Sequence, residues 1–452
     1  MTGHGTEHGD VSRGTRTLVF VPYLRGAGHG GPADVEAVRP LEGRVEEAVG
    51  LAAAISLDVL EGAAIPLSAY RPATLFGSGK VEEIKGRVAA DDVGLVVIDH
   101  VLSPVQQRNL EKEWKAKVID RTGLILEIFG ERAQTAEGRL QVELAHLNYQ
   151  RSRLVRSWTH LERQRGGFGF LGGPGETQIE ADRRQIDERI ARIEHDLEGV
   201  ARSRRLQRTN RKRLDRPVVA LVGYTNAGKS TLFNALTHAG TRAEDLLFAT
   251  LDPTLRRSRL PHGTEILVSD TVGFISELPT HLVAAFRATL EEVIEADLIL
   301  HVRDIAHPDT KIQAADVANV LEQLGVDPSD PAHIIEVWNK IDLLRPPASV
   351  EAVKATTGGT TLATIGVSAL TGEGLPELLA LIEDHLHASR DVFAVHLQGA
   401  ELADLHFLYE LGEVLDRQDR DDGTTDLRVR VAGRSVSAFR RRFPAATPEA
   451  RA

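Results

Sequence analysis

The sequence lacks cysteine altogether, which excludes disulfide bonds and thiolate-bound metal ions and suits a reducing cytoplasm. It has no apolar run near the roughly 18 residues of a membrane-spanning helix, so we expect no integral membrane contact. Residues 1–16 are rich in glycine and histidine and lack the apolar core of a signal peptide, so we expect a disordered tail. These absences predict a cytoplasmic protein, which we expect to act as a monomer.

Charge is unevenly distributed along the chain. The formal net charge of −11 argues against a nucleic-acid-binding surface over the whole protein. Residues 131–216, however, carry 19 Lys and Arg against 13 Asp and Glu. One basic segment in an acidic protein is the pattern expected when a single element faces a polyanion.

At 452 residues, the chain should form about three domains. Alternating apolar strands and helical stretches predict a small α/β domain at 17–130 and a doubly wound α/β domain at 217–389. Between them, residues 131–216 show two apolar stripes at 3- and 4-residue spacings, which predict an antiparallel helical hairpin. Residues 390–452 predict a small α+β domain.

Local signals predict individual elements. In the first domain we expect strands at 18–21 and 95–98, and helices at 81–90 and 103–115 with Ser103 as the N-cap and Pro104 at the first helical position. The turn Gly77-Ser78-Gly79-Lys80 is interpreted as a strand-to-helix connection, with a contact to phosphate or RNA as the alternative. In the last domain we expect a helix at 402–415 and a strand at 425–431, packed onto the neighbouring domain rather than around a large core of its own.

The hairpin carries two features that its helix packing does not require. Its end, residues 202–216, holds eight Lys and Arg with Asp215 as the one acidic residue. We favour contact with a phosphate backbone over a merely solvated linker. Its glycine-rich tip, 166–175, contains Phe168 and Phe170, which suit stacking on unpaired bases, or else fold back onto another domain.

A phosphate-binding motif follows the expected buried strand 218–222. Its residues fit G-x-x-x-x-G-K-[ST] and are Gly223, Tyr224, Thr225, Asn226, Ala227, Gly228, Lys229 and Ser230, with Thr231 opening the expected helix. In this context, backbone N–H groups can surround a pyrophosphate. Lys229 would reach the β- and γ-phosphates, and the Ser230 hydroxyl would ligate Mg²⁺.

Two further motifs predict a guanine nucleotide. Asp270, Thr271, Val272 and Gly273 follow the strand 265–269, where Asp270 can hold Mg²⁺ through a water and the Gly273 N–H can meet a γ-phosphate. The base-binding residues that we predict are Asn339, Lys340, Asp342, Ser368 and Ala369. The Asp342 carboxylate can accept from guanine N1–H and the 2-amino group, donors that adenine lacks. Asn339 would support the O6/N7 edge, and Lys340 would lie along the ring. Because these motifs follow strands in order, GTP or GDP is the expected ligand.

These motifs resemble those of P-loop GTPases of the translation-factor-related class. The segment Phe248-Ala249-Thr250-Leu251-Asp252-Pro253-Thr254 resembles switch I of the Obg–HflX superfamily. Residues 172–180 (GGPGETQIE) and 120–126 (DRTGLIL) resemble the HflX family specifically. Phe248, Ala249, Thr250, Leu251 and Asp252 thereby join the predicted nucleotide-binding residues. The expected fold is a P-loop GTPase doubly wound sheet, preceded by the α/β domain and the hairpin and followed by the small α+β domain.

The resemblance also implies roles and a function. Thr250 would be the switch I threonine that joins Ser230 on Mg²⁺, with Thr254 as the alternative, and Lys229, Thr250 and Gly273 would be the catalytic residues. The family implies a GTPase that binds the large ribosomal subunit, here through 131–216, and splits or rescues stalled or idle ribosomes under stress. The residues alone support a GTPase with an RNA-facing element.

Hydrolysis should be slow without a partner. Phe274 follows Gly273 where many GTPases carry a glutamine that orients the attacking water, and the family shares this departure. Ribosomal components could order the switches, or K⁺ could be held by Asn226, which otherwise only stabilises the turn. Competing functions are a GTP-dependent RNA-binding or ribosome-assembly switch, a GTPase linked to RNA modification, and a membrane-associated regulator. The last is less favoured because no broad apolar face accompanies the basic residues.

Overall fold

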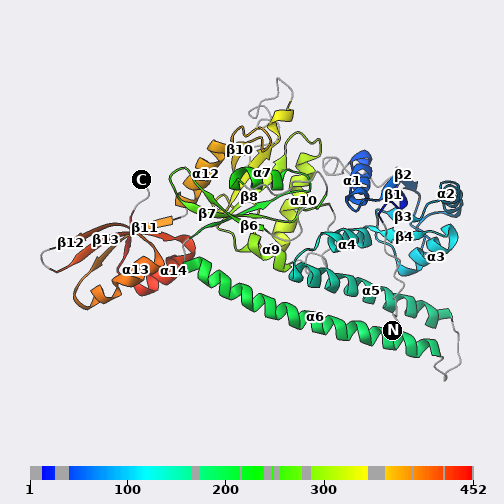
Figure 1. The fold of residues 1–452 in the computed structure, drawn as a ribbon, viewed down its shortest axis with the longest axis horizontal. Coiled ribbons are helices and arrows are strands. Elements are labelled where there is room, and N and C mark those ends of the chain that lie inside the picture. Colours follow the sequence, from blue (N-terminus) through cyan, green and yellow to red (C-terminus); the bar gives the residue numbers. More distant parts are fainter. Residues whose placement is uncertain are drawn as a thin grey trace, which may run out of the picture.

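The computed structural model describes residues 13–25, 40–164, 174–213, 216–238, 247–248, 254–276, 287–344, 362–388, 390–420 and 423–449. Three sheets follow one another along these residues, and two long helices lie between the first and the second (Figure 1). The expected disordered tail lies outside the described residues up to position 12. Within the described part of the chain, no helix is both long enough and apolar enough to cross a membrane.

The N-terminal unit is a four-stranded parallel sheet in the order β2-β1-β3-β4. Its elements are β1 (Arg16–Leu24), α1 (Leu41–Ala54), β2 (Asp58–Leu67), α2 (Ser78–Ala90), β3 (Leu95–Ile98), α3 (Pro104–Trp114), β4 (Lys117–Asp120) and α4 (Arg121–Arg132). The predicted α3 cap is present: the Ser103 hydroxyl accepts from the Gln106 N–H while the Gln106 side chain accepts from the Ser103 N–H. The segment Gly77–Lys80 forms the turn into α2, with Gly77 as the N-cap.

The helical hairpin consists of α5 (Ala136–Gln164) and α6 (Pro174–Arg213), which run side by side (Figure 1). Ion pairs Arg189–Glu143, at 2.7 Å, and Arg151–Asp187, at 3.3 Å, join the two helices. The tip residues Phe168 and Phe170 lie outside the described residues, as do the side chains of 203–215.

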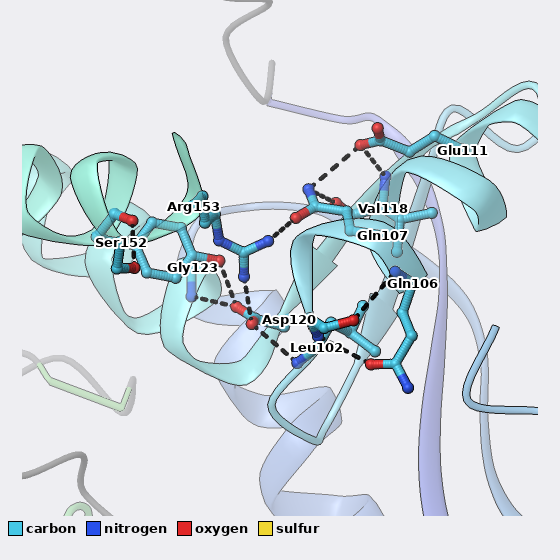
Figure 2. Close-up of polar contacts among 11 residues, drawn as sticks. Leu102, Gln106, Gln107, Glu111, Val118, Asp120, Gly123, Ser152 and Arg153 are labelled. Carbon is cyan, nitrogen blue, oxygen red and sulfur yellow. Dashed lines mark hydrogen bonds and ion pairs between the residues drawn. The ribbon is translucent and has the colours of Figure 1, made fainter. Parts of the chain in front are cut away.

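Asp120 fastens α5 to the N-terminal unit. It is fully buried at the junction of β4 and α4, where it accepts from the Gly123 N–H (2.8 Å) and the Leu102 N–H (3.2 Å). From α5, the Tyr149 hydroxyl and the Arg153 guanidinium each donate to its carboxylate at 2.6 Å. Figure 2 shows Arg153 reaching between Asp120 and Gln107. The pKa of the Tyr149 hydroxyl is raised by burial and by the Asp120 charge.

The central unit is a six-stranded sheet in the order β10-β9-β8-β5-β7-β6, parallel except for β6. Its elements are β5 (Val218–Val222), α7 (Lys229–Thr237), β6 (Thr254–Arg259), β7 (Glu265–Asp270), α9 (Arg287–Ile294), β8 (Leu298–Asp304), α10 (Thr310–Gln323), β9 (Ile334–Asn339), the 3₁₀ turn η1 (Ile341–Leu343), β10 (Ala363–Gly366) and α12 (Leu375–Ala388). This is the doubly wound arrangement that the sequence predicts, with the motif residues at the carboxyl ends of β5, β7, β9 and β10.

The C-terminal unit is a small α+β arrangement, as the sequence predicts, but its predicted helix is too long. It contains β11 (Arg390–Leu397), the 3₁₀ turn η2 (Gly399–Asp404), α13 (Leu405–Leu411), β12 (Glu413–Asp419), β13 (Thr425–Ala432), α14 (Gly433–Arg442) and β14 (Thr447–Pro448), with the sheet order β12-β13-β11-β14. The predicted helix at 402–415 is therefore wrong in its last part, which is strand β12. Phe393, Phe439 and Phe443 pack against one another with tilted rings in a small core within this unit.

One apolar core crosses from the N-terminal unit into the central unit. It joins buried side chains of α1 and α4 to Phe248, Val272 and Phe274 of the central unit. The rings of Phe129 and Phe248 meet edge to face at 4.8 Å between centroids. The loops around the carboxyl ends of β5 and β7 are therefore packed against the N-terminal unit.

Candidate nucleotide-binding site

The loop between β5 and α7 has the backbone that a phosphate cradle requires. Gly228 caps α7 with a φ of +88°, and a Cβ there would lie 2.2 Å from the Asn339 side-chain nitrogen. Gly223 approaches the Val302 carbonyl so closely that a Cβ would lie 2.2 Å from its oxygen. Asn226 also has a positive φ, of 59°, which asparagine tolerates better than most residues. Glycine at 223 and 228 is thus required by close packing.

Lys229 lies inside this loop. Its side chain is buried and its ammonium donates to the carbonyls of Gly223 (3.0 Å) and Tyr224 (2.7 Å). Burial lowers the pKa of Lys229 to about 8, although the negative charge of Asp270 opposes the shift. Anionic phosphates placed here would favour the charged ammonium.

Ser230 and Asp270 form the part of the predicted Mg²⁺ site that the structure describes. The Ser230 hydroxyl donates to the Asp270 carboxylate at 2.8 Å, at the meeting point of α7 and β7. Two oxygen groups this close fit a hard cation such as Mg²⁺. Thr250 lies outside the described residues, as do Ala249, Leu251 and Asp252. Among the described residues, no cluster of three His, Cys, Asp or Glu side chains could hold a metal.

The predicted base-binding residues come together beyond β9 and β10. Asn339 is buried and braces the site: its amide donates to the Ala227 carbonyl at 2.9 Å and its oxygen accepts from the Ala369 N–H at 3.0 Å. Lys340 pairs with Asp304 at 2.8 Å. Asp342 is exposed in η1, and Ser368 is fully buried. Asn339 thus joins the phosphate loop to the base loop, and its contact with the O6/N7 edge of the base stays a prediction.

Gly273 and Phe274 lie directly against the phosphate loop. The Phe274 N–H donates to the Gly223 carbonyl (3.1 Å), and the Thr225 N–H donates to the Phe274 carbonyl (2.7 Å). A Cβ on Gly273 would lie 2.8 Å from Thr225 Cγ2 and 3.1 Å from Lys229 Nζ. The Phe274 side chain is buried in the shared core, so it cannot orient a water molecule.

The N-terminal unit contacts this site through a buried polar cluster that the motifs did not predict. The Tyr224 hydroxyl donates to the Glu47 carboxylate, and Arg121 donates to Glu47 (2.6 Å) and to Asp99 (2.5 Å). Although burial opposes it, the two carboxylates raise the pKa of Arg121. Ser276 completes the cluster. Its N–H donates to the Tyr224 hydroxyl, its hydroxyl donates to Glu47, and its carbonyl accepts from Arg121. Arg121 belongs to a segment that the sequence singles out, but no local signal marks Glu47.

A cavity of about 280 Å³ lies where the two units meet. Its walls are α1 of the N-terminal unit, Tyr224 to Asn226 of the phosphate loop, Leu247, and Asp304, His307 and Gln313 of the β8–α10 region. It therefore adjoins the first part of the phosphate loop, including Thr225 and Asn226.

Four protein-family models match nearly the whole chain. They are a GTP-binding GTPase N-terminal model (residues 42–130), a GTP-binding GTPase middle-region model (132–211), a 50S ribosome-binding GTPase model (218–340) and an HflX C-terminal domain model (352–451).

Curated relatives match over similar lengths. The chain is 50% identical to a GTPase HflX of Magnetococcus marinus over 393 residues, covering 86% of this chain and 89% of the relative. It is 44% identical to a GTPase HflX of Escherichia coli over 389 residues, covering 85% and 88%. A crystal structure of a GTP-binding protein from Sulfolobus solfataricus in complex with GDP covers 82% of this chain and 98% of its own, with 22% identity and a TM-score of 0.44.

Proposed function

Because this chain belongs to the HflX family of GTPases, and is a GTP hydrolase that binds guanine nucleotide, we propose that it associates with the large ribosomal subunit and splits or rescues stalled or idle ribosomes under stress. The observation that carries this proposal is the basic hairpin joined to the GTPase unit. Within residues 131–216, α5 and α6 form two long helices, and the sequence from 202 to 216 concentrates Lys and Arg, a composition that suits a polyanion such as ribosomal RNA. The match of 218–340 to a 50S ribosome-binding GTPase model supports the same partner.

We propose the following division of the chain: a tail (1–16), an α/β domain (17–130), the hairpin (131–216), the GTP-binding domain (217–389) and a C-terminal domain (390–452). The protein would act as a cytoplasmic monomer. In the GTP-binding domain, the nucleotide residues would be those predicted from the motifs. Ser230 and Thr250 would ligate Mg²⁺, with Asp270 acting through a water, and the cation would neutralise phosphate charge.

Lys229, Thr250 and Gly273 would stabilise the transferring phosphoryl group, and hydrolysis would need help from outside the site. Phe274 is buried and cannot place a water molecule, so an ordered partner or a cation must supply the missing stabilisation. Asn226, in a left-handed turn beside the cavity, is the proposed K⁺ ligand. Turnover measured in KCl and in NaCl tests this role, since equal rates would exclude K⁺ stimulation.

The ribosome proposal is tested by co-sedimentation with purified large subunits. Binding should be tighter with a non-hydrolysable GTP analogue than with GDP, and should weaken as salt rises. Subunits should also stimulate GTP hydrolysis. Absence of binding at low salt, or binding indifferent to nucleotide, would contradict the proposal.

The hairpin's part in binding is tested by charge removal. Replacing Arg204, Arg205 and Arg208 by glutamine should weaken subunit binding and flatten its salt dependence, with the slope falling by about 1 for each phosphate that these arginines bind in the wild type. The matched control replaces Arg183 and Arg184, two exposed arginines of α6 that face Asp187 and Glu188 on the same helix. Equally weak binding in both variants would mean that the basic end has no specific role.

A further inference from the structure

Thr225 carries a hydroxyl that the fold itself does not use. The residue is 6% exposed, and its Oγ1 has no hydrogen-bond partner in the part of the chain that the structure describes. Leaving a buried hydroxyl unpaired costs on the order of 1–3 kcal/mol. Valine has nearly the same shape and would avoid this cost. Such a group therefore calls for a partner that the folded chain alone does not supply.

The position of Thr225 indicates that partner. It is the third residue of the phosphate loop, two residues after Gly223, and its N–H donates to the Phe274 carbonyl at 2.7 Å. A Cβ added to Gly273 would lie 2.8 Å from Thr225 Cγ2 and 3.1 Å from the Lys229 ammonium, so Thr225 and Lys229 both lie against Gly273. Lysine of the loop and the glycine N–H of D-x-x-G are the two groups that meet a γ-phosphate. Thr225 therefore flanks the γ-phosphate position.

Neighbouring residues do not offer a substitute for this hydroxyl. Phe274 places an apolar ring where a glutamine amide would stand, and the ring is buried in the shared core. Asn226 is exposed, unlike the buried Thr225. The Ser230 hydroxyl is already directed to the Asp270 carboxylate. On this side of the loop, Thr225 thus offers a buried neutral donor that has no partner among the described residues.

We propose that Thr225 is a further catalytic residue, whose hydroxyl donates a hydrogen bond to a γ-phosphoryl oxygen of GTP. The inference rests on the proposed nucleotide site but not on the ribosome as partner. GDP has no γ-phosphate, so the contact distinguishes the two nucleotides. A hydrogen bond to a charged oxygen that strengthens as charge develops raises turnover more than it raises affinity.

The test compares Thr225→Val with Thr225→Ser. The valine variant should lose roughly 10- to 100-fold in kcat for intrinsic GTP hydrolysis, the range expected for a hydrogen bond to a charged group. The serine variant keeps the hydroxyl and should retain most of the activity. GDP affinity should be unchanged in both variants, whereas affinity for a non-hydrolysable GTP analogue should fall in the valine variant. Because the valine variant keeps every hydrogen bond of the fold, its melting temperature should not decrease.

A matched control is Thr237→Val in α7. Its hydroxyl donates to the Phe233 carbonyl at 2.7 Å, remote from the phosphate loop, so turnover should be preserved. Unchanged turnover in Thr225→Val would overturn the proposal. Equal decreases in GDP and GTP-analogue affinity would also overturn it, because they would mean a change in loop shape. If the wild-type protein does not bind ribosomal subunits, the ribosome proposal fails. The comparison of intrinsic GTP hydrolysis rates still decides the role of Thr225.

Discussion

The hydroxyl of Tyr224 in the phosphate loop donates a hydrogen bond to the carboxylate of Glu47 in the N-terminal unit. The same hydroxyl accepts from the Ser276 N–H at 2.8 Å, and the Ser276 hydroxyl donates to Glu47 at 2.8 Å. Ser276 lies three residues after Gly273. The N-terminal unit therefore holds the segment after D-x-x-G against the phosphate loop, with Gly273 beside Lys229.

The first prediction concerns this contact. Tyr224→Phe removes the hydroxyl that bonds the buried Glu47 carboxylate and the Ser276 N–H. The loss should destabilise the arrangement in which Ser276 is held against the phosphate loop by about 1–3 kcal/mol. Because a γ-phosphate must separate Gly273 from Lys229, the variant should bind a GTP analogue more tightly relative to GDP, by roughly 5- to 100-fold. Equilibrium titration with fluorescent nucleotides measures the ratio. Glu42→Gln, an exposed substitution on α1, the helix that carries Glu47, is the control. An unchanged ratio of GTP-analogue affinity to GDP affinity in Tyr224→Phe would contradict the prediction.

The second prediction concerns base recognition. Asp342 is exposed in η1, one turn beyond the buried brace Asn339. Asp342→Asn should lower affinity for GDP and raise it for xanthosine diphosphate, because the amide can donate to the 2-oxo group of xanthine. Competition binding with GDP and xanthosine diphosphate measures the change in nucleotide preference. Asp327→Asn, on a distant exposed loop, should keep the guanine preference; loss of all nucleotide binding in Asp342→Asn would instead indicate a structural role.

Local patterns predicted those parts of the fold that depend on neighbours in sequence. The phosphate loop, the Ser103 cap and the strand ends all depend on spacing within a few residues. The Glu47–Tyr224 contact joins residues 177 positions apart, and a single sequence carries no signal for such a pairing. The edge-to-face contact of Phe129 with Phe248 is likewise a packing contact between units that lie far apart in the sequence.

The C-terminal unit shows why one predicted helix was too long. The apolar spacing of 402–415 continues past Gly412, but that residue is extended, and a Cβ on it would lie 2.7 Å from the Arg430 carbonyl oxygen. Helix α13 therefore ends at Leu411. Strand β12 is mostly polar, and its hydrogen bonds to β13 define it. Its amino-acid pattern alone does not indicate a strand.

The third prediction concerns the attachment of the hairpin. The Asp120 carboxylate is fully buried and is paired with Arg153 of α5. Asp120→Asn removes this charge, leaving Arg153 without its partner, and should destabilise the protein by about 3–5 kcal/mol. Thermal or urea unfolding measures the change in stability. The control Arg151→Gln breaks a half-exposed pair with Asp187 and should cost less than about 1 kcal/mol. Equal stability of Asp120→Asn and wild type would mean that the pair does not hold the hairpin.

The fourth prediction concerns protons taken up with the nucleotide. Burial lowers the pKa of Lys229 to about 8 in the free protein, whereas bound phosphates favour its ammonium form. Well below pH 8, Lys229 is charged before and after binding, so it takes up almost no proton there. Above pH 8, the free protein has lost the proton and the complex regains it, so GDP binding at pH 9 should take up close to one proton. Calorimetry in two buffers of different ionisation enthalpy measures this uptake as a difference in heat. Lys229→Arg stays charged throughout and should abolish the difference, even if it binds GDP more weakly. Heats independent of buffer at pH 9 in the wild type would show that Lys229 is already charged in the free protein.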